Sequence, residues 1–375
     1  MQPPAGIGNI SNISHNYVPK YIAIISGITG QDGSYLAEFL VQKGYIIYGL
    51  VRRSSITKLD RLTPDLLQYP FLFMRDIDMT DSVSIYNLLR EIKETHAFQR
   101  IEIYNLAAQS HVKISFETPE YSTNVNAIGP LRILEAIRQN GLVRRTRFYQ
   151  ACTSELYGKV QETPQRETTP FYPRSPYGVS KLFSFWITKN YRESYDMFAC
   201  NGILFNHESE RRGDDFVTRK VTRGVARLLH NASEPPIELG NIDAKRDWGH
   251  AEDYVRGMWM MLQQDVPDDY VLATGETHSV REFVELAFER IGVTIIWSGK
   301  NENEVGCDIH TGRPLVKINP QYYRPAEVDM LIGDASKAAI FFGWRPSISF
   351  NALVNRMVDY DVIAHARNEQ RIQIL

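Results

Sequence analysis

The sequence predicts an α/β fold, with a Rossmann-like doubly wound parallel sheet and a smaller, mixed α/β C-terminal lobe. Up to about residue 205, short apolar runs alternate with segments of helical period, which is typical of parallel βαβ units. A glycine-rich turn joins the first apolar run to the first helical segment. After residue 206, loops rich in charged and aromatic residues replace this pattern. Such irregularity suits a lobe that closes over a ligand.

The apolar runs predict the strands of the main sheet in order. A helix follows the first strand and ends near Gly44, because Leu36, Phe39 and Leu40 share one helical face. The stretch Thr80-Asp81-Ser82 could cap a second helix at its N-terminus. The predicted strands are 21–26, 46–51, 71–74, 101–106, 147–152 and 198–204, with a later strand returning near 270–273.

Composition narrows the class of protein. The chain has 375 residues and a net charge of -2, so no general attraction to nucleic acid or anionic membranes is expected. No apolar run approaches the ~20 residues that span a bilayer. The polar N-terminal segment lacks the apolar core of a signal peptide. Cys152, Cys200 and Cys307 lack metal-ligand spacing, which favours a cytoplasmic protein with no metal site.

We expect three regions along the chain. Residues 1–20 are polar and predict a flexible tail. Residues 21–205 form the predicted dinucleotide-binding domain, and residues 206–375 mainly bind substrate. Segments near 240–275 are expected to return to the first domain, so the boundary is soft.

Gly27, Gly30 and Gly33 lie between a predicted strand and a predicted helix. Glycine lets the backbone turn tightly and approach a pyrophosphate at the helix N-terminus. A glycine triplet alone is weak evidence, since many loops contain one. Its place in a βαβ unit makes it a predicted dinucleotide site.

The end of the second strand indicates which dinucleotide is bound. An acidic residue there would bind the ribose 2′-hydroxyl of NAD, but the chain has Arg52, Arg53, Ser54 and Ser55 instead. Guanidinium and hydroxyl groups suit a 2′-phosphate, which favours NADP. The alternative is an ordinary solvated basic loop.

Tyr177 and Lys181 are four residues apart, so they share one face of a helix. This pair suits removal of a hydroxyl proton while hydride leaves the same carbon. Lowering a phenol pKa from ~10 to ~7 takes about 4 kcal/mol, which we expect from the charges of Lys181 and an oxidised nicotinamide. The alternative is an ordinary amphipathic pair.

Glu155 supplies a further acid/base group at a predicted strand end, where ligands bind such sheets. Simple alcohol oxidation does not need this carboxylate, so it indicates elimination chemistry on a sugar. Thr153 and Ser154 can orient a sugar hydroxyl. Alternatively, Glu155 is a helix cap or the partner of a structural arginine. Cys152 is expected to be a buried strand residue and not a nucleophile.

These motifs resemble the extended short-chain dehydrogenase/reductase family, and within it the GDP-mannose 4,6-dehydratases. The resemblance covers nearly everything after residue 20. Departures are Cys152, where a serine is expected, Glu210, where a proline is expected, and the acidic pair at 214–215. The matching stretches are 27–35, 52–55, 105–112, 153–181, 202–208, 243–250 and 322–325.

The resemblance also implies further contacts. Besides the glycines, the residues at 52–55 and Lys181, cofactor contacts are implied for Thr29, Gln31, Asp32, Asp78, Met79, Leu106, Ala107, Ala108, Gln109, Ser110, Tyr121, His207 and Arg212. Implied substrate contacts are Ser110, Asn206, Val217, Lys220, Arg246, Arg324 and Glu327.

The implied reaction converts GDP-mannose to GDP-4-dehydro-6-deoxy-D-mannose, a step toward GDP-fucose. Tyr177, aided by Thr153, takes the 4-hydroxyl proton while hydride passes to NADP. Glu155 then removes the C5 proton and donates a proton to the leaving 6-hydroxyl, after which the hydride returns to C6 and a proton to C5. The loop at 52–58 resembles one that meets a neighbouring subunit, which implies a homodimer or homotetramer.

Two alternatives remain at this point. Another sugar-nucleotide 4,6-dehydratase or a 4-epimerase would use the same fold, although an epimerase needs no acid/base at Glu155. A non-catalytic NADP-binding protein is disfavoured because all the catalytic side chains are present.

Overall fold

The computed structural model describes residues 20–55, 59–323, 328 and 330–374. Its centre is a 7-stranded sheet, in the order β11-β6-β5-β4-β1-β2-β3, in which every pairing is parallel. The predicted fold class is thereby confirmed. The strands are β1 (Tyr21–Ser26), β2 (Ile46–Val51), β3 (Leu72–Asp76), β4 (Arg100–Asn105), β5 (Thr146–Thr153), β6 (Phe198–Leu204) and β11 (Tyr270–Leu272).

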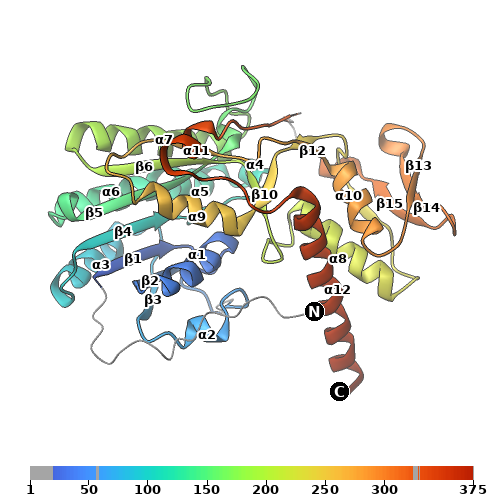
Figure 1. Cartoon of the computed structure of the whole chain (residues 1–375), viewed down its shortest axis with the longest axis horizontal. Helices are drawn as coiled ribbons and strands as arrows, with labels where there is room; N and C mark the ends of the chain where they lie inside the picture. The colour runs from blue at the N-terminus through green and yellow to red at the C-terminus, as the bar shows by residue number, and fades with distance from the viewer. Residues whose placement is uncertain (1–19, 56–58, 324–327, 329, 375) are drawn as a thin grey trace.

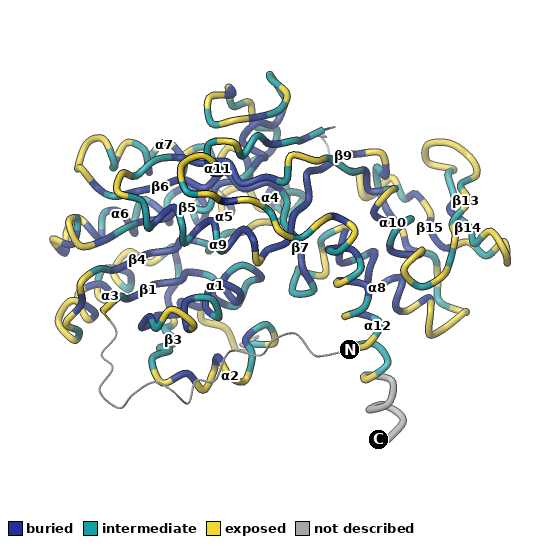
Figure 2. Tube along the Cα trace, in the orientation of Figure 1, coloured by how far each residue is buried: buried dark blue, intermediate teal, exposed yellow. Residues whose placement is uncertain are grey.

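Helices cover both faces of this sheet (Figure 1). One face packs against α1 (Gln31–Gln42) and α9 (Ala251–Met261). The other packs against α3 (Ser82–Thr95), α6 (Gly129–Gln139) and α7 (Pro176–Tyr195). Figure 2 shows the central strands buried and the connecting loops exposed. Burial on both faces explains why these strands read as continuous apolar runs in the sequence.

Local signals set the helix boundaries. The predicted cap Asp81 accepts hydrogen bonds from the N–H groups of Val83 and Ser84 at the start of α3. α1 ends at Gln42, close to the expected Gly44. The strand expected near residue 270 is β11, which pairs with β6 and so returns to the main sheet.

The second layer of structure is a mixed sheet with the order β13-β14-β15-β8. Its strands pack with three helices around a separate apolar core. The strands are β8 (Ile237–Leu239), β13 (Ile295–Ser298), β14 (Val305–Asp308) and β15 (Pro314–Ile318), and the helices are α8 (Val217–His230), α10 (Val280–Glu289) and α12 (Phe350–Ile374).

The expectation that loops dominate after residue 206 is wrong in detail. Two short pairs of strands join the lobes: β7 (Asn206–Glu208) with β10 (Trp248–His250), and β9 (Lys245–Arg246) with β12 (His278–Ser279). Their polar residues carry no apolar alternation, so the sequence pattern misses them. The smaller elements are α2 (Pro64–Leu67), α4 (Val112–Glu117), α5 (Pro119–Thr123), η2 (Asn124–Ile128), η3 (Val143–Arg145), η4 (Ser154–Leu156), η5 (Asn301–Asn303), η6 (Pro320–Tyr322) and α11 (Ser336–Phe342). Within the described ranges, no helix combines the length and apolar character needed to cross a bilayer.

Candidate active site

A cavity of about 820 Å³ opens at the carboxyl ends of the main strands and extends toward the second sheet. It gathers predicted residues from many parts of the chain. The lining includes Gly27, Thr29, Gly30, Gln31, Asp32 and Gly33 from the β1–α1 turn; Arg52, Asp78 and Met79 after β2 and β3; Leu106, Ala107, Ala108, Gln109 and Ser110 after β4; Tyr121; Thr153, Ser154 and Glu155 after β5; Tyr177 and Lys181; and Asn206, His207, Arg212, Val217, Lys220 and Arg246.

Five predicted residues are not among the lining residues. Arg53, Ser54 and Ser55 are exposed and do not line the cavity. Arg324 and Glu327 lie outside the described residues.

The glycine turn has the geometry that a pyrophosphate requires. Gly27 has a φ of 74°, in the left-handed region that favours glycine. A Cβ on Gly33, in the first turn of α1, would lie 2.3 Å from the carbonyl oxygen of Gly27, so no larger residue fits at this position. No side chain caps the start of α1 at Gly30, and the first residues of α1 line the cavity. The N-terminus of this helix is therefore at the cavity. These features fit a bound dinucleotide phosphate.

His207 and Asp32 link this turn to β7. The His207 Nε2 atom lies 2.8 Å from Asp32 Oδ2, while Nδ1 lies 2.8 Å from the carbonyl oxygen of Phe205. Burial raises the pKa of Asp32, but the charge and hydrogen bond of His207 outweigh it and lower the pKa. Burial lowers the pKa of His207, but the charge and the hydrogen bond of Asp32 outweigh burial and raise this pKa above its usual value. The two therefore form an ion pair at the cavity wall.

The basic corner of the cavity lies just after β2. The Arg52 guanidinium donates a 2.5 Å hydrogen bond to the hydroxyl of Tyr121, on α5. Both residues line the cavity, and no carboxylate follows β2 before Asp60. This corner can accept an anionic group.

The predicted catalytic side chains converge where β5 ends and α7 begins. Thr153 Oγ1 accepts a 3.2 Å hydrogen bond from the N–H of Glu155 and so starts η4. Ser175 caps α7 by accepting from the N–H of Gly178, 3.0 Å away. This cap places Tyr177 in the first helical turn, where its hydroxyl is hydrogen-bonded to the side chain of Thr153. Glu155 and Tyr177 are only 9% and 8% exposed.

In the protein without a cofactor, the pKa of the Tyr177 hydroxyl is raised. Burial raises it well above the usual range, and the negative charge of Glu155 adds to this, although Thr153 opposes it. Lys181 donates to the carbonyl oxygen of Ala151 at 2.8 Å, and burial lowers its pKa to about 8. The expected lowering of the Tyr177 pKa requires an oxidised nicotinamide as well as Lys181, so it stays a prediction; in the protein alone, burial dominates.

Cys152 is a buried strand residue, as expected. It is 4% exposed and its thiol lies 3.4 Å from Asn201 Oδ1. Burial raises the pKa of its thiol, which disfavours the nucleophilic thiolate.

The far end of the cavity carries two predicted cations. The Lys220 ammonium lies 3.5 Å from the centre of the Tyr322 ring. The buried Arg246 guanidinium donates to the carbonyl oxygen of Val328 at 2.7 Å. Lys113 also lines this end and donates to the carbonyl oxygen of Gln321 at 3.0 Å. These charges suit a diphosphate.

Sequence reasoning missed several residues that shape the cavity. Asn126, in η2, holds the loop after β4 in place, because its side chain bonds both the N–H and the carbonyl oxygen of Gln109 at 2.9 and 3.0 Å. The available signal was a polar residue within an apolar helical run. Lys113 and Tyr322 were also missed, since only the fold brings them to the cavity.

Comparison with known proteins identifies the family. The family model described as GDP-mannose 4,6 dehydratase matches residues 24–357. A GDP-mannose 4,6 dehydratase of Cricetulus griseus is 56% identical over 349 residues, which are 92% of each chain. A GDP-mannose 4,6-dehydratase of Sinorhizobium fredii is 57% identical over 347 residues, covering 92% of this chain and 97% of that one.

Solved structures share the fold at lower identity. A UDP-glucose 4-epimerase of Thermus thermophilus in complex with NAD has a TM-score of 0.71 at 24% identity, over 91% of this chain and 98% of that one. RMD from Pseudomonas aeruginosa complexed with NADPH has a TM-score of 0.69 at 20% identity, over 91% and 99%. With its sequence matched over nearly its whole length, the chain belongs to the GDP-mannose 4,6-dehydratase family.

Proposed function

We propose that this protein converts GDP-mannose to GDP-4-dehydro-6-deoxy-D-mannose and water, with a nicotinamide cofactor that is regenerated in each turnover. The observation that carries the proposal is the grouping of Glu155, Tyr177 and Thr153 in one buried part of the cavity. An oxidation alone needs one base. A second buried carboxylate beside it suits removal of water.

Each residue has a distinct role in this proposal. Tyr177 takes the proton of the mannose 4-hydroxyl, and Thr153 holds that hydroxyl through the same hydrogen-bonding group that contacts Tyr177. Glu155 removes the proton at C5, which the C4 ketone acidifies, and donates a proton to the departing 6-hydroxyl. C5 takes up a proton as the hydride returns to C6, and this proton balances the one that Tyr177 took from the 4-hydroxyl. Burial of these groups keeps bulk water from competing for the protons.

The glycine turn and the corner around Arg52 would hold the cofactor. When bound, the nicotinamide supplies a temporary hydride store for the hydrogen taken from C4 and returned to C6. NADP is our proposed form, because Arg52 meets the cavity where a ribose 2′-phosphate would lie and no carboxylate follows β2 directly. RMD, which shares the fold, was solved with NADPH.

We also propose a division of labour along the chain. Residues 21–205 mainly bind the cofactor, and residues 206–375 mainly bind the nucleotide sugar through Asn206, Lys220 and Arg246. The cations at that end of the cavity support this division, since a GDP sugar carries two phosphates.

The first test is incubation of purified protein with GDP-mannose, without added reductant, followed by mass spectrometry. Loss of one water from GDP-mannose, but not from dTDP- or UDP-glucose, is the expected result. No mass change with any of the three would contradict the proposal, and a new isomer of unchanged mass would indicate a 4-epimerase.

One substitution, with a matched control, tests the role of Glu155. Glu155→Gln should keep cofactor binding but stop water loss, because an amide cannot take the C5 proton; Glu91→Gln, in an exposed pair with Arg75, is the control and should be fully active. Normal product formation by Glu155→Gln would exclude its role.

Cofactor preference is tested separately. The double substitution of Arg52 and Arg53 by Ala should weaken binding of NADP much more than that of NAD, measured by titration. Equal effects on both cofactors would contradict the assignment of NADP.

A further inference from the structure

A short strip of chain, residues 207–211, is fastened along the start of α1. Besides the pair between His207 and Asp32, the Ser209 hydroxyl donates to the side-chain oxygen of Gln31 at 2.8 Å. Arg211, two residues further on, forms a paired contact of 3.0 Å with the carboxylate of Glu38. The strip thus runs beside the helix whose N-terminus faces the cavity.

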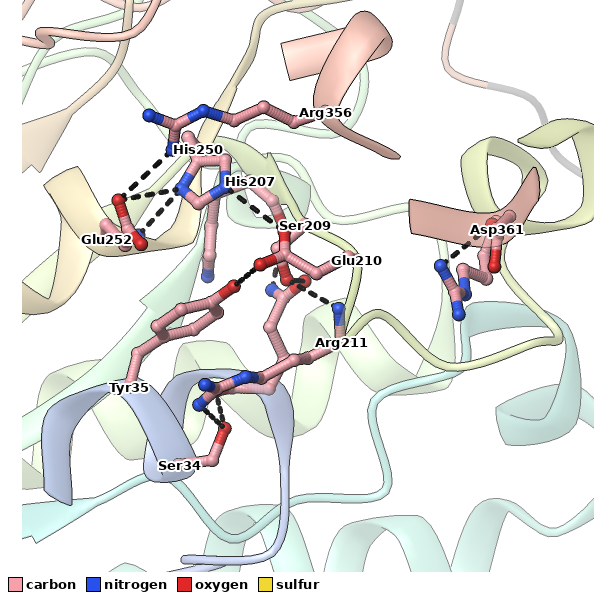
Figure 3. Close-up of polar contacts among 12 residues, drawn as sticks. Ser34, Tyr35, His207, Ser209, Glu210, Arg211, His250, Glu252, Arg356 and Asp361 are labelled. Atoms are coloured by element: carbon pink, nitrogen blue, oxygen red, sulfur yellow. Dashed lines mark hydrogen bonds and ion pairs between the residues drawn. The ribbon is translucent and has the colours of Figure 1, made fainter. Parts of the chain in front are cut away.

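Glu210 makes the central contact of this strip. The hydroxyl of Tyr35, on α1, donates a 2.7 Å hydrogen bond to Glu210 Oε1. The other carboxylate oxygen lies 3.5 Å from Nε2 of His250, which ends β10. Figure 3 shows Glu210 between the Tyr35 ring and the His250 ring. One carboxylate therefore joins three elements: the strip, α1 and β10.

The environment keeps this carboxylate charged. Burial raises the pKa of Glu210, but contacts with His250 and Tyr35 outweigh it and lower the pKa to about 2. His250 is completely buried, and its Nδ1 accepts the N–H of Glu252 at the start of α9. Nε2 therefore carries the proton of the neutral ring, at 3.5 Å from Glu210 Oε2.

The residue at this position departs from the resemblance, in which a proline is expected. A proline stiffens a strip of chain through its own fixed φ, without a partner. Glu210 instead holds the strip through contacts with other elements. The effect of Glu210 on the strip therefore depends on Tyr35 and His250, and substitutions can test it.

We propose that Glu210 is a positioning residue for the cofactor. It holds the strip against α1, so that His207 before it and Arg212 after it stay at the cavity. Arg212 is placed further by Glu208, 3.0 Å from its guanidinium, and by the ring of Phe216, 3.6 Å away. This inference rests on the proposed cofactor site at the glycine turn.

The test compares cofactor affinity among variants of the purified protein. Glu210→Ala should raise the Kd for NADPH about tenfold, measured by fluorescence titration, because the central one of the contacts between the strip and α1 is lost. Tyr35→Phe should have a similar effect, and the double variant should be no weaker than either one. Glu252→Gln is the matched control, since that exposed carboxylate neighbours His250 without touching Glu210; its Kd should be unchanged.

Kinetics separate positioning from a general loss of structure. The KM for GDP-mannose should stay within about twofold, and dehydration by Glu210→Ala at saturating cofactor should approach that of the unchanged protein. Glu210→Gln should recover part of the affinity, since its amide oxygen can still accept from Tyr35. An unchanged Kd in Glu210→Ala and Glu210→Gln would overturn the proposal, as would additive effects with Tyr35→Phe. Absence of dehydration in the unchanged protein would instead overturn the proposed function, because the Kd comparison does not depend on turnover.

Discussion

Substitution of Asp247 should loosen the substrate end of the cavity. This completely buried carboxylate lies between β9 and β10, next to Arg246. Oδ1 accepts from the N–H and the hydroxyl of Thr274 at 2.8 and 2.7 Å. Oδ2 accepts from the N–H groups of Gly275 and Gly333 at 2.9 and 3.2 Å. The carboxylate thus fastens Arg246 to the segments after β11 and before α11.

The magnitude for Asp247→Ala follows from two opposing effects. The buried N–H of Gly333 loses its acceptor, at about 2 kcal/mol, and the part-buried N–H groups of Thr274 and Gly275 lose theirs, at about 1 kcal/mol each, or about 4 kcal/mol together. The Thr274 hydroxyl has a second acceptor in the carbonyl oxygen of Glu276, so we leave it out. Burial raises the pKa of Asp247 from 3.8 to about 6, against the lowering by its hydrogen bonds. At about 1.4 kcal/mol per unit, the substitution removes a charge that costs about 3 kcal/mol at pH 7. The net destabilisation at pH 7 is about 1 kcal/mol.

Urea unfolding at pH 7 and pH 5 measures this quantity. Because the folded pKa of Asp247 is raised, the cost of its charge is complete above about pH 6, decreases as the pH falls below that value, and is gone only below the unfolded pKa of 3.8. The difference in the free energy of unfolding between the unchanged protein and Asp247→Ala should therefore be larger at pH 5 than at pH 7. Asp243→Ala is the control: its side chain is 72% exposed beside Arg281, so its effect should stay below about 1 kcal/mol. A difference under about 0.5 kcal/mol for Asp247→Ala at both pH values would refute the reasoning.

Three other changes test the cofactor side of the cavity. Gly33→Ala places a methyl group 2.3 Å from a backbone oxygen and should abolish NADPH binding in a titration, whereas Gly141→Ala, with positive φ but no described atom within 4 Å, should retain it. The pKa of His207 is raised by Asp32, so the stabilisation from this pair is complete below about pH 6.5 and is lost as pH rises through the higher folded pKa. Thermal unfolding at several pH values should show this loss of stability, and the variant His207→Gln should not show it. Burial lowers the pKa of Lys181 to about 8, so Lys181→Met should raise the Tm by about 2–4 °C while abolishing turnover, and a lower Tm would contradict this.

Sequence pattern predicted the main sheet well because its strands are buried on both faces. The runs at 21–26, 46–51 and 198–204 coincide with β1, β2 and β6. The third strand was displaced, since β3 is an edge strand that continues through Arg75 and Asp76. Those polar residues pair with β2 in the backbone ladder, and side-chain hydropathy does not report that pairing.

The residues of the candidate site also fall into two groups, those that the sequence marks locally and those that it does not. Gly33, Glu155 and Tyr177 stand out because local spacing and strand ends mark them. Asn126 and Asp247 do not, since they act through partners that only the fold brings near: Gly333 is 86 residues from Asp247. Residues marked by a local motif or a strand end were therefore predictable, while residues that act through distant partners were not.

The state of Tyr177 connects the fold to the proposed chemistry. Burial and the charge of Glu155 both favour the neutral phenol, and Lys181 directs its ammonium at a backbone oxygen. A neutral phenol cannot take a proton from a sugar hydroxyl, so the role of base that we propose for Tyr177 needs the phenolate to be stabilised further. Positive charge near Tyr177 would do this, and an oxidised nicotinamide is the positively charged form of the proposed cofactor. The same burial that raises the pKa strengthens this added charge, because the local dielectric is low. The order of events would then follow from electrostatics: cofactor first, proton removal second.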